Sequence, residues 1–360
     1  MLRILHIITT IERGGAENQL LTLIRCQVSQ DMRVSVAFLK GQPQLESELL
    51  ALGVRIFNIT NAPITKQVVL IHKISKLGFD LVHTHLPRSE VLFALAFSTV
   101  PWITTRHNAE PFLPNSPSII SSVLSRIVLF RCSAIVAISD AVKKFLLESH
   151  EVGVASKLQV IYYGYSSRKT IELSVPSKLE VHDVIRLVTV SRLVPQKDIE
   201  TMLYACKILK EKGLVFNLKI IGEGYLKFEL QNLSRELELE HHVEFIGRIT
   251  DPAKVLSNSD IFLLTSLYEG FGLVLLEAMQ AKLPMVVCAN EAVVEVLGKN
   301  YYGLTRVKDK EAIAMKIISL LRPELREEVI SYLSSRLAKF SPELMSNNIS
   351  ILYRKIIKSK

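Results

Sequence analysis

The sequence contains few cysteines and no long hydrophobic run. Its four cysteines are far apart, without the paired spacing of a metal or redox site, and each lies in an apolar neighbourhood. We expect them to be buried thiols in a reducing cytoplasm. The longest uncharged apolar run, residues 91–105, is too short to span a bilayer. The apolar run at residues 2–8 is brief, and we expect a buried strand there rather than a signal peptide.

Aromatic residues are scarce, at 7% of the chain, and the basic residues do not interleave with them. Nucleic acid is therefore disfavoured as a partner, because stacking aromatics among cations are typical of such surfaces. Residues 1–170 hold 18 basic and 11 acidic side chains, and residues 171–360 hold 26 and 24. The basic first half favours anionic partners such as acidic lipid headgroups or phosphorylated substrates. A merely soluble basic surface would explain the excess equally well.

Short apolar runs alternate with helix-compatible segments along the whole chain. They lie at residues 4–9, 34–39, 54–59, 81–84, 102–105 and 134–138, and again at 185–190, 216–221, 243–246, 261–264 and 285–287. Such alternation is typical of parallel sheets covered by helices on both faces.

We therefore predict an α/β protein with two doubly wound, Rossmann-like domains that face one another across a cleft. The domains are residues 1–165 and 183–340. The linker should fall within residues 164–177, which contain turn formers and show no periodicity. Residues 341–360 begin with the N-cap Ser341 and Pro342, and they predict a terminal helix.

The stretch from Ser266 to Met279 carries the strongest functional signal. An apolar strand precedes it, and a glycine-rich turn leads into an apolar helix. Gly270 and Gly272 would let the backbone approach a ligand where the helix exposes free N–H groups, a place that attracts phosphate. Glu269 stands at the mouth of this turn, and Glu277 falls about one helical turn later. The alternative, a solvated pair of glutamates beside an ordinary turn, suits the apolar flanks poorly.

Two cations follow the strand at residues 187–190. Arg192 and Lys197 lie in the loop at its carboxyl end, just before a helix. Side chains there can neutralise a diphosphate leaving group through charge-assisted hydrogen bonds. An ordinary surface pair is the alternative, and the glutamate motif in the same half of the chain argues against it.

Glu269-Gly270-Phe271-Gly272, followed by Glu277, resembles the donor-site motif of the family 4 retaining glycosyltransferases, which have the glycosyltransferase-B fold. The resemblance implies that Glu277 holds the nucleotide ribose and that Glu269 lies beside the donor sugar. It also implies that the backbone from Gly270 through Phe271 and Gly272 to Leu273 meets the diphosphate, which Arg192 and Lys197 grip.

Further residues are assigned by the same resemblance. Gly222 in Gly222-Glu223-Gly224 and Arg248 would line the nucleotide site, and the terminal helix 341–360 would pack back on the first domain. Gly15 lies in a Gly-Gly-x-Glu loop that reaches toward the diphosphate or acceptor, although a tight strand-to-helix turn explains those residues equally well.

Histidines lie at three predicted strand ends. His107 matches the family's histidine beside the transferred sugar, where it would orient a sugar hydroxyl or the acceptor. We expect His83 and His85 to be packing residues. Tyr163 departs from the family pattern, which has asparagine before the glycine at position 164, and this puts an interdomain role for that side chain in doubt.

No Asp-x-Asp occurs in the chain, so we expect no metal ion and no other cofactor. Arg192, Lys197 and the helix N-terminus would then supply the charge at the leaving group. Residues 118–131 are apolar with arginines and no acid. They predict a core helix, or alternatively a helix resting on an anionic membrane beside the acceptor.

The sequence thus predicts a cytoplasmic, metal-independent, retaining glycosyltransferase, peripheral on the inner face of the membrane if residues 118–131 rest there. It would move sugar from a nucleotide diphosphate sugar to a glycan or lipid-linked acceptor, in polysaccharide or lipopolysaccharide biosynthesis. Two alternatives remain, a sugar-nucleotide epimerase of the same fold and a non-catalytic glycosyltransferase-like binding subunit. Turnover of the donor without an acceptor would indicate the epimerase.

Overall fold

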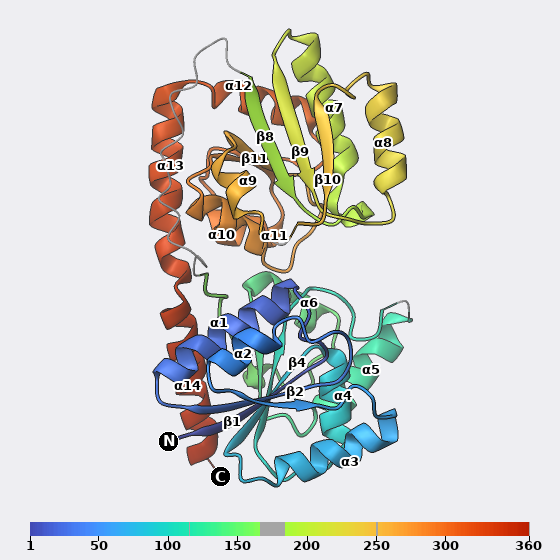
Figure 1. Ribbon diagram of the computed structural model, residues 1–360, viewed down its shortest axis with the longest axis vertical. Helices are drawn as coiled ribbons and strands as arrows, with labels where there is room; N and C mark the ends of the chain where they lie inside the picture. Colours follow the sequence, from blue (N-terminus) through green and yellow to red (C-terminus); the bar gives the residue numbers. More distant parts are fainter. Residues whose placement is uncertain (115, 166–183, 250, 360) are drawn as a thin grey trace. The chain divides into compact units, whose positions relative to one another are not determined.

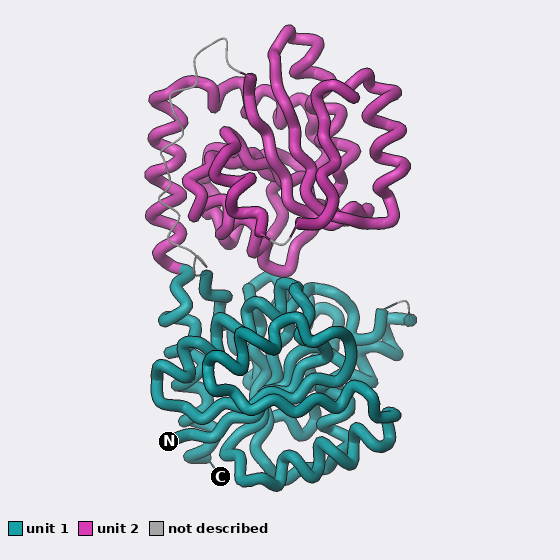
Figure 2. The backbone as a smooth tube through the Cα atoms, in the orientation of Figure 1, with its two compact units in different colours: residues 1–166, 340–360 teal, residues 167–339 magenta. Residues whose placement is uncertain are grey.

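The computed structural model describes residues 1–114, 116–165, 184–249 and 251–359. The chain forms two compact units (Figure 2). Unit 1 comprises residues 1–166 and 340–360, and unit 2 comprises residues 167–339. Most of the linker expected at residues 164–177 lies outside the described residues.

Unit 1 is built on a seven-stranded sheet in the order β3-β2-β1-β4-β5-β6-β7, in which all neighbours run parallel. All five residues of β4 and five of the six in β1 are buried. A strand covered by helices on both faces has no side toward water, which is why these strands are buried along almost their whole length, their histidines included. The strands are β1 (Arg3–Ile8), β2 (Arg33–Phe38), β3 (Arg55–Asn58), β4 (Leu81–His85), β5 (Trp102–Arg106), β6 (Ala134–Ala137) and β7 (Leu158–Val160).

The helices of unit 1 include the last helix of the chain, α14 (Pro342–Lys358), as Figure 1 shows by its label and colour. Ser341 caps α14 by accepting a hydrogen bond from the Leu344 amide at 3.1 Å, so the predicted cap is confirmed. The others are α1 (Gly15–Ser29), α2 (Glu46–Ala51), α3 (Ile64–Ser75), α4 (Pro87–Leu95), α5 (Ser118–Leu129), α6 (Asp140–Glu148) and the 3-10 turn η1 (Ala155–Lys157).

Side chains of α14 bond to those of α1. Gln30 donates from Nε2 to the Asn347 side chain at 2.8 Å, and its Oε1 accepts from the Ser350 hydroxyl at 3.0 Å. Gln27 donates to the Tyr353 hydroxyl at 3.2 Å. The two helices are more than 300 residues apart in sequence, so this packing holds the last helix of the chain against the first helix of unit 1.

Unit 2 holds a six-stranded sheet in the order β10-β9-β8-β11-β12-β13, again with parallel neighbours. The prediction of two parallel, helix-covered sheets is therefore confirmed. The prediction missed β7 and β13, whose three and two residues give little periodicity. The strands of unit 2 are β8 (Ile185–Val190), β9 (Phe216–Ile221), β10 (Val243–Gly247), β11 (Ile261–Leu264), β12 (Met285–Cys288) and β13 (Leu304–Thr305).

Helices follow most strands of unit 2, as the βαβ pattern requires. They are α7 (Ile199–Glu211), α8 (Lys227–Glu236), α9 (Ala253–Ser257), α10 (Leu273–Gln280), α11 (Glu291–Leu297), α12 (Lys310–Ser319) and α13 (Pro323–Leu337), with 3-10 turns η2 (Pro195–Lys197) and η3 (Ala338–Phe340).

In both sheets the strand order reverses beside the first strand of the unit. In unit 2 the reversal falls between β8 and β11, and in unit 1 it falls between β1 and β4. Ligands of open parallel sheets bind beyond the carboxyl ends of the strands at such a switch point. The two loops that follow β8 and β11 are therefore the first place to examine.

The structure agrees with most of the predictions about the cysteines and about membrane-spanning segments. All four thiols are free, and Cys132, Cys206 and Cys288 are buried. Cys26 is only partly buried on α1, so its predicted burial was wrong. Within the described part of the chain, no helix combines the length and apolarity that crossing a bilayer requires.

Candidate donor-binding site

Two loops of unit 2 meet beyond the carboxyl ends of β8 and β11. The first spans residues 191–198 and the second spans residues 265–272. The Thr265 hydroxyl donates to the Lys197 carbonyl at 3.0 Å, and the Leu267 amide donates to the Gln196 carbonyl at 2.9 Å. The pairing of β8 with β11 brings these distant loops into one place.

Lys197 and Glu269 form an ion pair inside this junction. The Lys197 ammonium lies 2.5 Å from a carboxylate oxygen of Glu269, and the side chains are only 12% and 8% exposed. Because few waters surround them, each charge depends on the other, and removing one would leave the other nearly buried and unpaired. The two predicted site residues, 72 positions apart in sequence, therefore form a single ion pair.

Arg192 joins the same junction through Gln196. Its guanidinium donates to the Gln196 side-chain carbonyl at 3.1 Å, and the Gln196 amide nitrogen donates to the Tyr268 carbonyl at 2.8 Å. Arg192 itself is exposed. Its charge is therefore held near the loop before α10 while it remains open to a ligand from solvent.

The start of α10 has the geometry that an anion requires. Gly272 precedes the helix with a φ of 82°, a left-handed conformation that glycine adopts without a steric penalty. Gly272 has no side chain that could cap the helix, and the first turn of α10 holds no acidic residue. Phe271 is 2% exposed and packs the turn onto the interior. The positive end of the helix dipole thus follows directly on Glu269 and its lysine partner.

His107 lies just after β5 in unit 1. Its Nε2 is 3.1 Å from Nδ1 of His85, and its Nδ1 bonds to the Tyr163 hydroxyl. Burial, with the nearby Arg106 guanidinium, lowers the pKa of His107 to about 3. The ring is therefore neutral at pH 7, and both of its nitrogens are occupied.

Two family models match the chain and together extend from residue 13 to residue 335. The model described as Glycosyltransferase Family 4 matches residues 13–168, and the one described as Glycosyl transferases group 1 matches residues 171–335. The chain belongs to the family 4 glycosyltransferases. The second match contains both loops of the junction, and the first contains His107.

Relatives and solved structures agree with this assignment. EpsF of Bacillus subtilis, provisionally named a glycosyltransferase, is 24% identical over 87% of this chain and 85% of its own length. The capsular polysaccharide biosynthesis glycosyltransferase CapM of Staphylococcus aureus is 25% identical over 66% of this chain and 65% of its own. The structure of Anabaena Alr3699/HepE in complex with UDP-glucose superposes with a TM-score of 0.82 at 21% identity, covering 99% of this chain and all of that one.

The remaining predicted site residues of this glycosyltransferase are divided between its two units. Glu277 is partly buried on α10, and Arg248 is exposed directly after β10. Gly15 is the first residue of α1, and Glu17 accepts a hydrogen bond from the Thr10 hydroxyl at 2.5 Å. Their contacts with ribose, base and diphosphate stay predictions.

Gly222 has a packing reason to be glycine. A Cβ atom there would lie 1.9 Å from the Ser191 carbonyl oxygen, and φ is 141°. A Cβ atom on Gly224 would similarly meet the Leu193 carbonyl oxygen at 2.1 Å. The loop after β9 thus presses against the backbone on either side of Arg192. Its Gly-x-Gly pattern is explained by this contact, and a role of Gly222 in lining the nucleotide site stays a prediction.

We expect Gly222→Ala to destabilise unit 2 by about 3 kcal/mol or more, because the added methyl group collides with backbone that cannot rotate away. Gly213→Ala is the matched control, since Gly213 also has a positive φ but has open space where the methyl group would go. Backbone strain alone should cost the control about 1 kcal/mol. Urea unfolding of both variants measures the difference, and equal losses would contradict the proposed collision.

Sequence reasoning missed residues that the fold brings beside the predicted ones within each unit. Gln196, in the junction of unit 2, carries no motif. Tyr163, beside His107 in unit 1, was noted only as a departure from the family pattern. The alternation of His83 and His85 gave a usable signal, because residues two apart in a strand share one face. His85 in fact bonds to His107, whereas His83 bonds to Tyr353 and Thr105 as expected of a packing residue.

Proposed function

We propose that this glycosyltransferase moves a sugar from a nucleotide diphosphate sugar to a glycan or lipid-linked acceptor, with retention of anomeric configuration and without a metal ion. The paired charges of Lys197 and Glu269 at the start of α10 carry the proposal. The UDP-glucose bound by Alr3699/HepE supports a nucleotide sugar as donor. The name of CapM supports a pathway of capsular polysaccharide synthesis.

In this proposal the leaving diphosphate lies against the backbone from Gly270 to Leu273. Lys197 and Arg192 balance its charge as the glycosidic bond breaks, in the position that a metal ion has in other transferases. Glu269 orients Lys197 and faces the donor sugar. Glu277, one turn along α10, accepts hydrogen bonds from the ribose.

The test measures turnover of a panel of UDP-, GDP- and ADP-sugars, with lipid extracts as the source of acceptor. Each reaction is run with and without EDTA. We expect one donor to be consumed only when acceptor is present, at a rate that EDTA leaves unchanged, and NMR of the product to show the anomer of the donor. Donor consumption without acceptor would favour the epimerase. Nucleotide binding without any turnover would favour the non-catalytic subunit.

We further propose that α5 rests on an anionic membrane at the cytoplasmic face. The helix buries Ser121, Ser122 and Ser125, whereas Ile119 and Ile127 on its outer side are 75% and 67% exposed. Two of these serines bond to a buried charge cluster: the Ser125 hydroxyl accepts from Arg106, and the Ser121 hydroxyl donates to Glu151. The Ser122 hydroxyl donates to the Ile119 carbonyl of the same helix. Val128 and Leu129 are buried with the serines, so the helix has an apolar outer face in addition to its packed inner one. An exposed apolar face of this kind favours a lipid interface.

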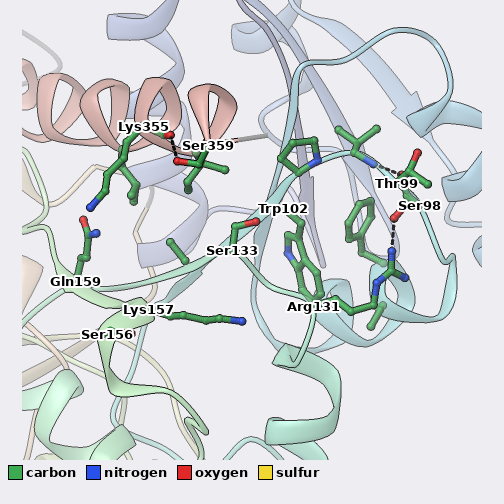
Figure 3. Close-up of a pocket in the computed structure, with 17 residues that line it drawn as sticks. Ser98, Thr99, Trp102, Arg131, Ser133, Ser156, Lys157, Gln159, Lys355 and Ser359 are labelled. Carbon is green, nitrogen blue, oxygen red and sulfur yellow. Dashed lines mark hydrogen bonds between the residues drawn. The ribbon is translucent and has the colours of Figure 1, made fainter.

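Basic side chains lie where α5 ends. A cavity of about 530 Å³ there is lined by Arg131, Lys157 and Lys355, together with serine hydroxyls (Figure 3). None of the described residues that line it is aspartate or glutamate. Arg131 donates to the Ser98 carbonyl at 2.7 Å, and Lys157 donates to the carbonyl of Phe130, whose ring is 80% exposed. Cations beside exposed apolar side chains suit the headgroups and chains of acidic lipids.

We expect the wild-type protein to co-sediment with phosphatidylglycerol vesicles and to bind phosphatidylcholine vesicles much less. Ile120→Gln combined with Ile127→Gln should weaken binding about tenfold or more, since each exposed aliphatic side chain contributes about 1 kcal/mol on burial. Leu50→Gln with Val69→Gln is the control, because both residues are similarly exposed elsewhere on unit 1. Equal binding by the two variants would refute the role of α5.

The electrostatic part is tested separately by Arg131→Gln with Lys355→Gln. This variant should lose binding to acidic vesicles, and its remaining binding should depend less on salt. Arg33→Gln with Lys66→Gln removes the same charge from exposed positions of unit 1 outside the cavity. A matching loss in this control would mean that net charge alone attracts the membrane.

A further inference from the structure

A continuous chain of hydrogen bonds runs through the interior of unit 1, from His107 and Tyr163 to the C-terminal helix. It joins side chains of β1, β4, α1 and α14 that are all buried. In order, the bonded atoms are the Tyr163 hydroxyl and His107 Nδ1, His107 Nε2 and His85 Nδ1 (3.1 Å), His85 Nε2 and His6 Nδ1 (3.0 Å), His6 Nε2 and Gln27 Oε1 (2.9 Å), Gln27 Nε2 and the Tyr353 hydroxyl (3.2 Å), the Tyr353 hydroxyl and His83 Nδ1 (2.7 Å), and His83 Nε2 and the Thr105 hydroxyl (2.7 Å).

All four imidazoles in this chain are neutral at pH 7. Burial lowers the pKa of His6 to about 4 and, with Arg106 nearby, that of His107 to about 3. Burial and the neighbouring rings hold the pKa values of His83 and His85 well below their usual range. A neutral imidazole has one N–H donor and one bare nitrogen, so each ring in the chain must donate at one nitrogen and accept at the other.

Gln27 sets the direction of the hydrogen bonds that lead to His107. Its carbonyl oxygen can only accept, so the hydrogen of His6 must be on Nε2 and its Nδ1 must accept from His85. The same step repeated along the chain places the hydrogen of His107 on Nε2. Nδ1 of His107 is then a bare acceptor, and the Tyr163 hydroxyl donates to it.

The other arm of the chain has the same direction. The Gln27 amide nitrogen can only donate, so the Tyr353 hydroxyl accepts from it and passes its own hydrogen to Nδ1 of His83. Nε2 of His83 then donates to Thr105. The oxygen of the Gln27 amide only accepts and its nitrogen only donates. The orientation of this one amide therefore sets the direction of the hydrogen bonds in both arms.

These rings are also the cluster most like a metal site in the described chain. Nitrogens of His6, His83 and His85 come within 4.8 Å of one another. A metal ion would need their lone pairs, yet each ring already uses both nitrogens in the hydrogen-bond chain. The hydrogen-bond chain and a bound metal are therefore mutually exclusive.

We propose that Gln27 is the positioning residue for His107, because it obliges His107 to present a bare Nδ1 acceptor at the site. A hydroxyl must donate to this atom. In the structure the Tyr163 hydroxyl supplies it, and a substrate hydroxyl replaces it in the complex. This inference rests on the proposed function for the identity of the ligand, but the state of the His107 ring can be measured without any ligand.

The first experiment records ¹⁵N chemical shifts of the histidine rings in the full-length protein at pH 7.5. We expect the His107 signal, assigned by its loss in His107→Gln, to show a protonated Nε2 and an unprotonated Nδ1. The opposite direction would require the Gln27 amide to be turned over, and it would place the hydrogen on Nδ1. That result would overturn the proposal. Stoichiometric binding of zinc that abolishes the ¹⁵N shifts of the hydrogen-bonded rings would overturn it as well.

The second experiment compares two substitutions of Gln27. Gln27→Met removes the anchor, so His107 should populate both tautomers and kcat should fall about tenfold with nucleotide affinity unchanged. Gln27→Glu places a carboxylate against Nε2 of His6, which favours a second proton on that ring. Nδ1 of His6 would then donate to His85, and the hydrogen of His107 should move to Nδ1. Thermal unfolding identifies variants that fail to fold. If the His107 ring had the same state in both folded variants as in the wild type, Gln27 would have no positioning role; absence of turnover in the wild type would instead refute the proposed function and leave the ring measurement intact.

Discussion

Lys197→Gln should lower kcat/KM for the nucleotide sugar by about 10²–10³-fold, the loss typical of removing one preorganised group from a developing negative charge. In the proposed function the lysine balances the diphosphate as it leaves. In the structure it pairs with Glu269 at 2.5 Å in a place that is nearly closed to water. The substitution therefore removes a cation and leaves a carboxylate unpaired at once. Initial rates over a range of donor concentrations measure the effect.

The double variant Lys197→Gln with Glu269→Gln separates these two causes. If Lys197 acted only as the partner of Glu269, the double variant would be as active as Glu269→Gln alone. We expect it to be less active than Glu269→Gln, because the diphosphate also lacks its cation. Lys299→Gln, an exposed cation elsewhere in unit 2, should leave kcat/KM within about twofold of the wild type.

Acid should destabilise unit 1 strongly between pH 6.5 and pH 4. His6 has a pKa of about 4 in the folded protein against about 6.5 in an unfolded chain, because burial opposes its charge. In this range the unfolded chain takes up a proton that the folded protein refuses, so the free energy of unfolding falls as the pH falls. Over the full interval His6 alone accounts for about 3 kcal/mol, and the other buried rings act in the same direction.

Trp102 gives a direct measurement of this effect, because it is the single tryptophan of the chain and is buried in unit 1. Urea unfolding followed by its fluorescence should show full stability above pH 6.5 and a steep loss below it. His6→Gln should flatten the slope against pH by about one proton, whereas His150→Asn, at an exposed histidine, should leave the slope unchanged. A slope that is the same with and without His6 would contradict the effect of burial.

The donor motif could be predicted because its parts are adjacent in sequence. Glu269, the two glycines and Glu277 follow one another within a single strand, turn and helix, so local periodicity suffices to place them. The helix cap Ser341 was found for the same reason, since it bonds to an amide three residues away. Roles for ligand contacts rest on resemblance alone and await the experiments above.

Two features of α5 and the histidines could not have been predicted locally. The sequence of α5 favours burial of its isoleucines, yet the fold turns its serines inward because Arg106 and Glu151 need partners there. His83 matched the expectation of a packing residue, but its contacts come from β5 and α14, far along the chain. Such partners depend on strand order and register, which apolar periodicity does not specify.

The order of residues by itself determined the two helix-covered parallel sheets and the strand, turn and helix that hold Glu269 and Glu277, because these depend on short-range periodicity and turn chemistry. The tertiary structure alone decided that Lys197 reaches Glu269 across 72 residues, and that Gln27 is connected to His107 through two other rings. The physical reason is that crossovers join strands that are distant in sequence, and only their final pairing determines which side chains meet at the carboxyl edge of a sheet.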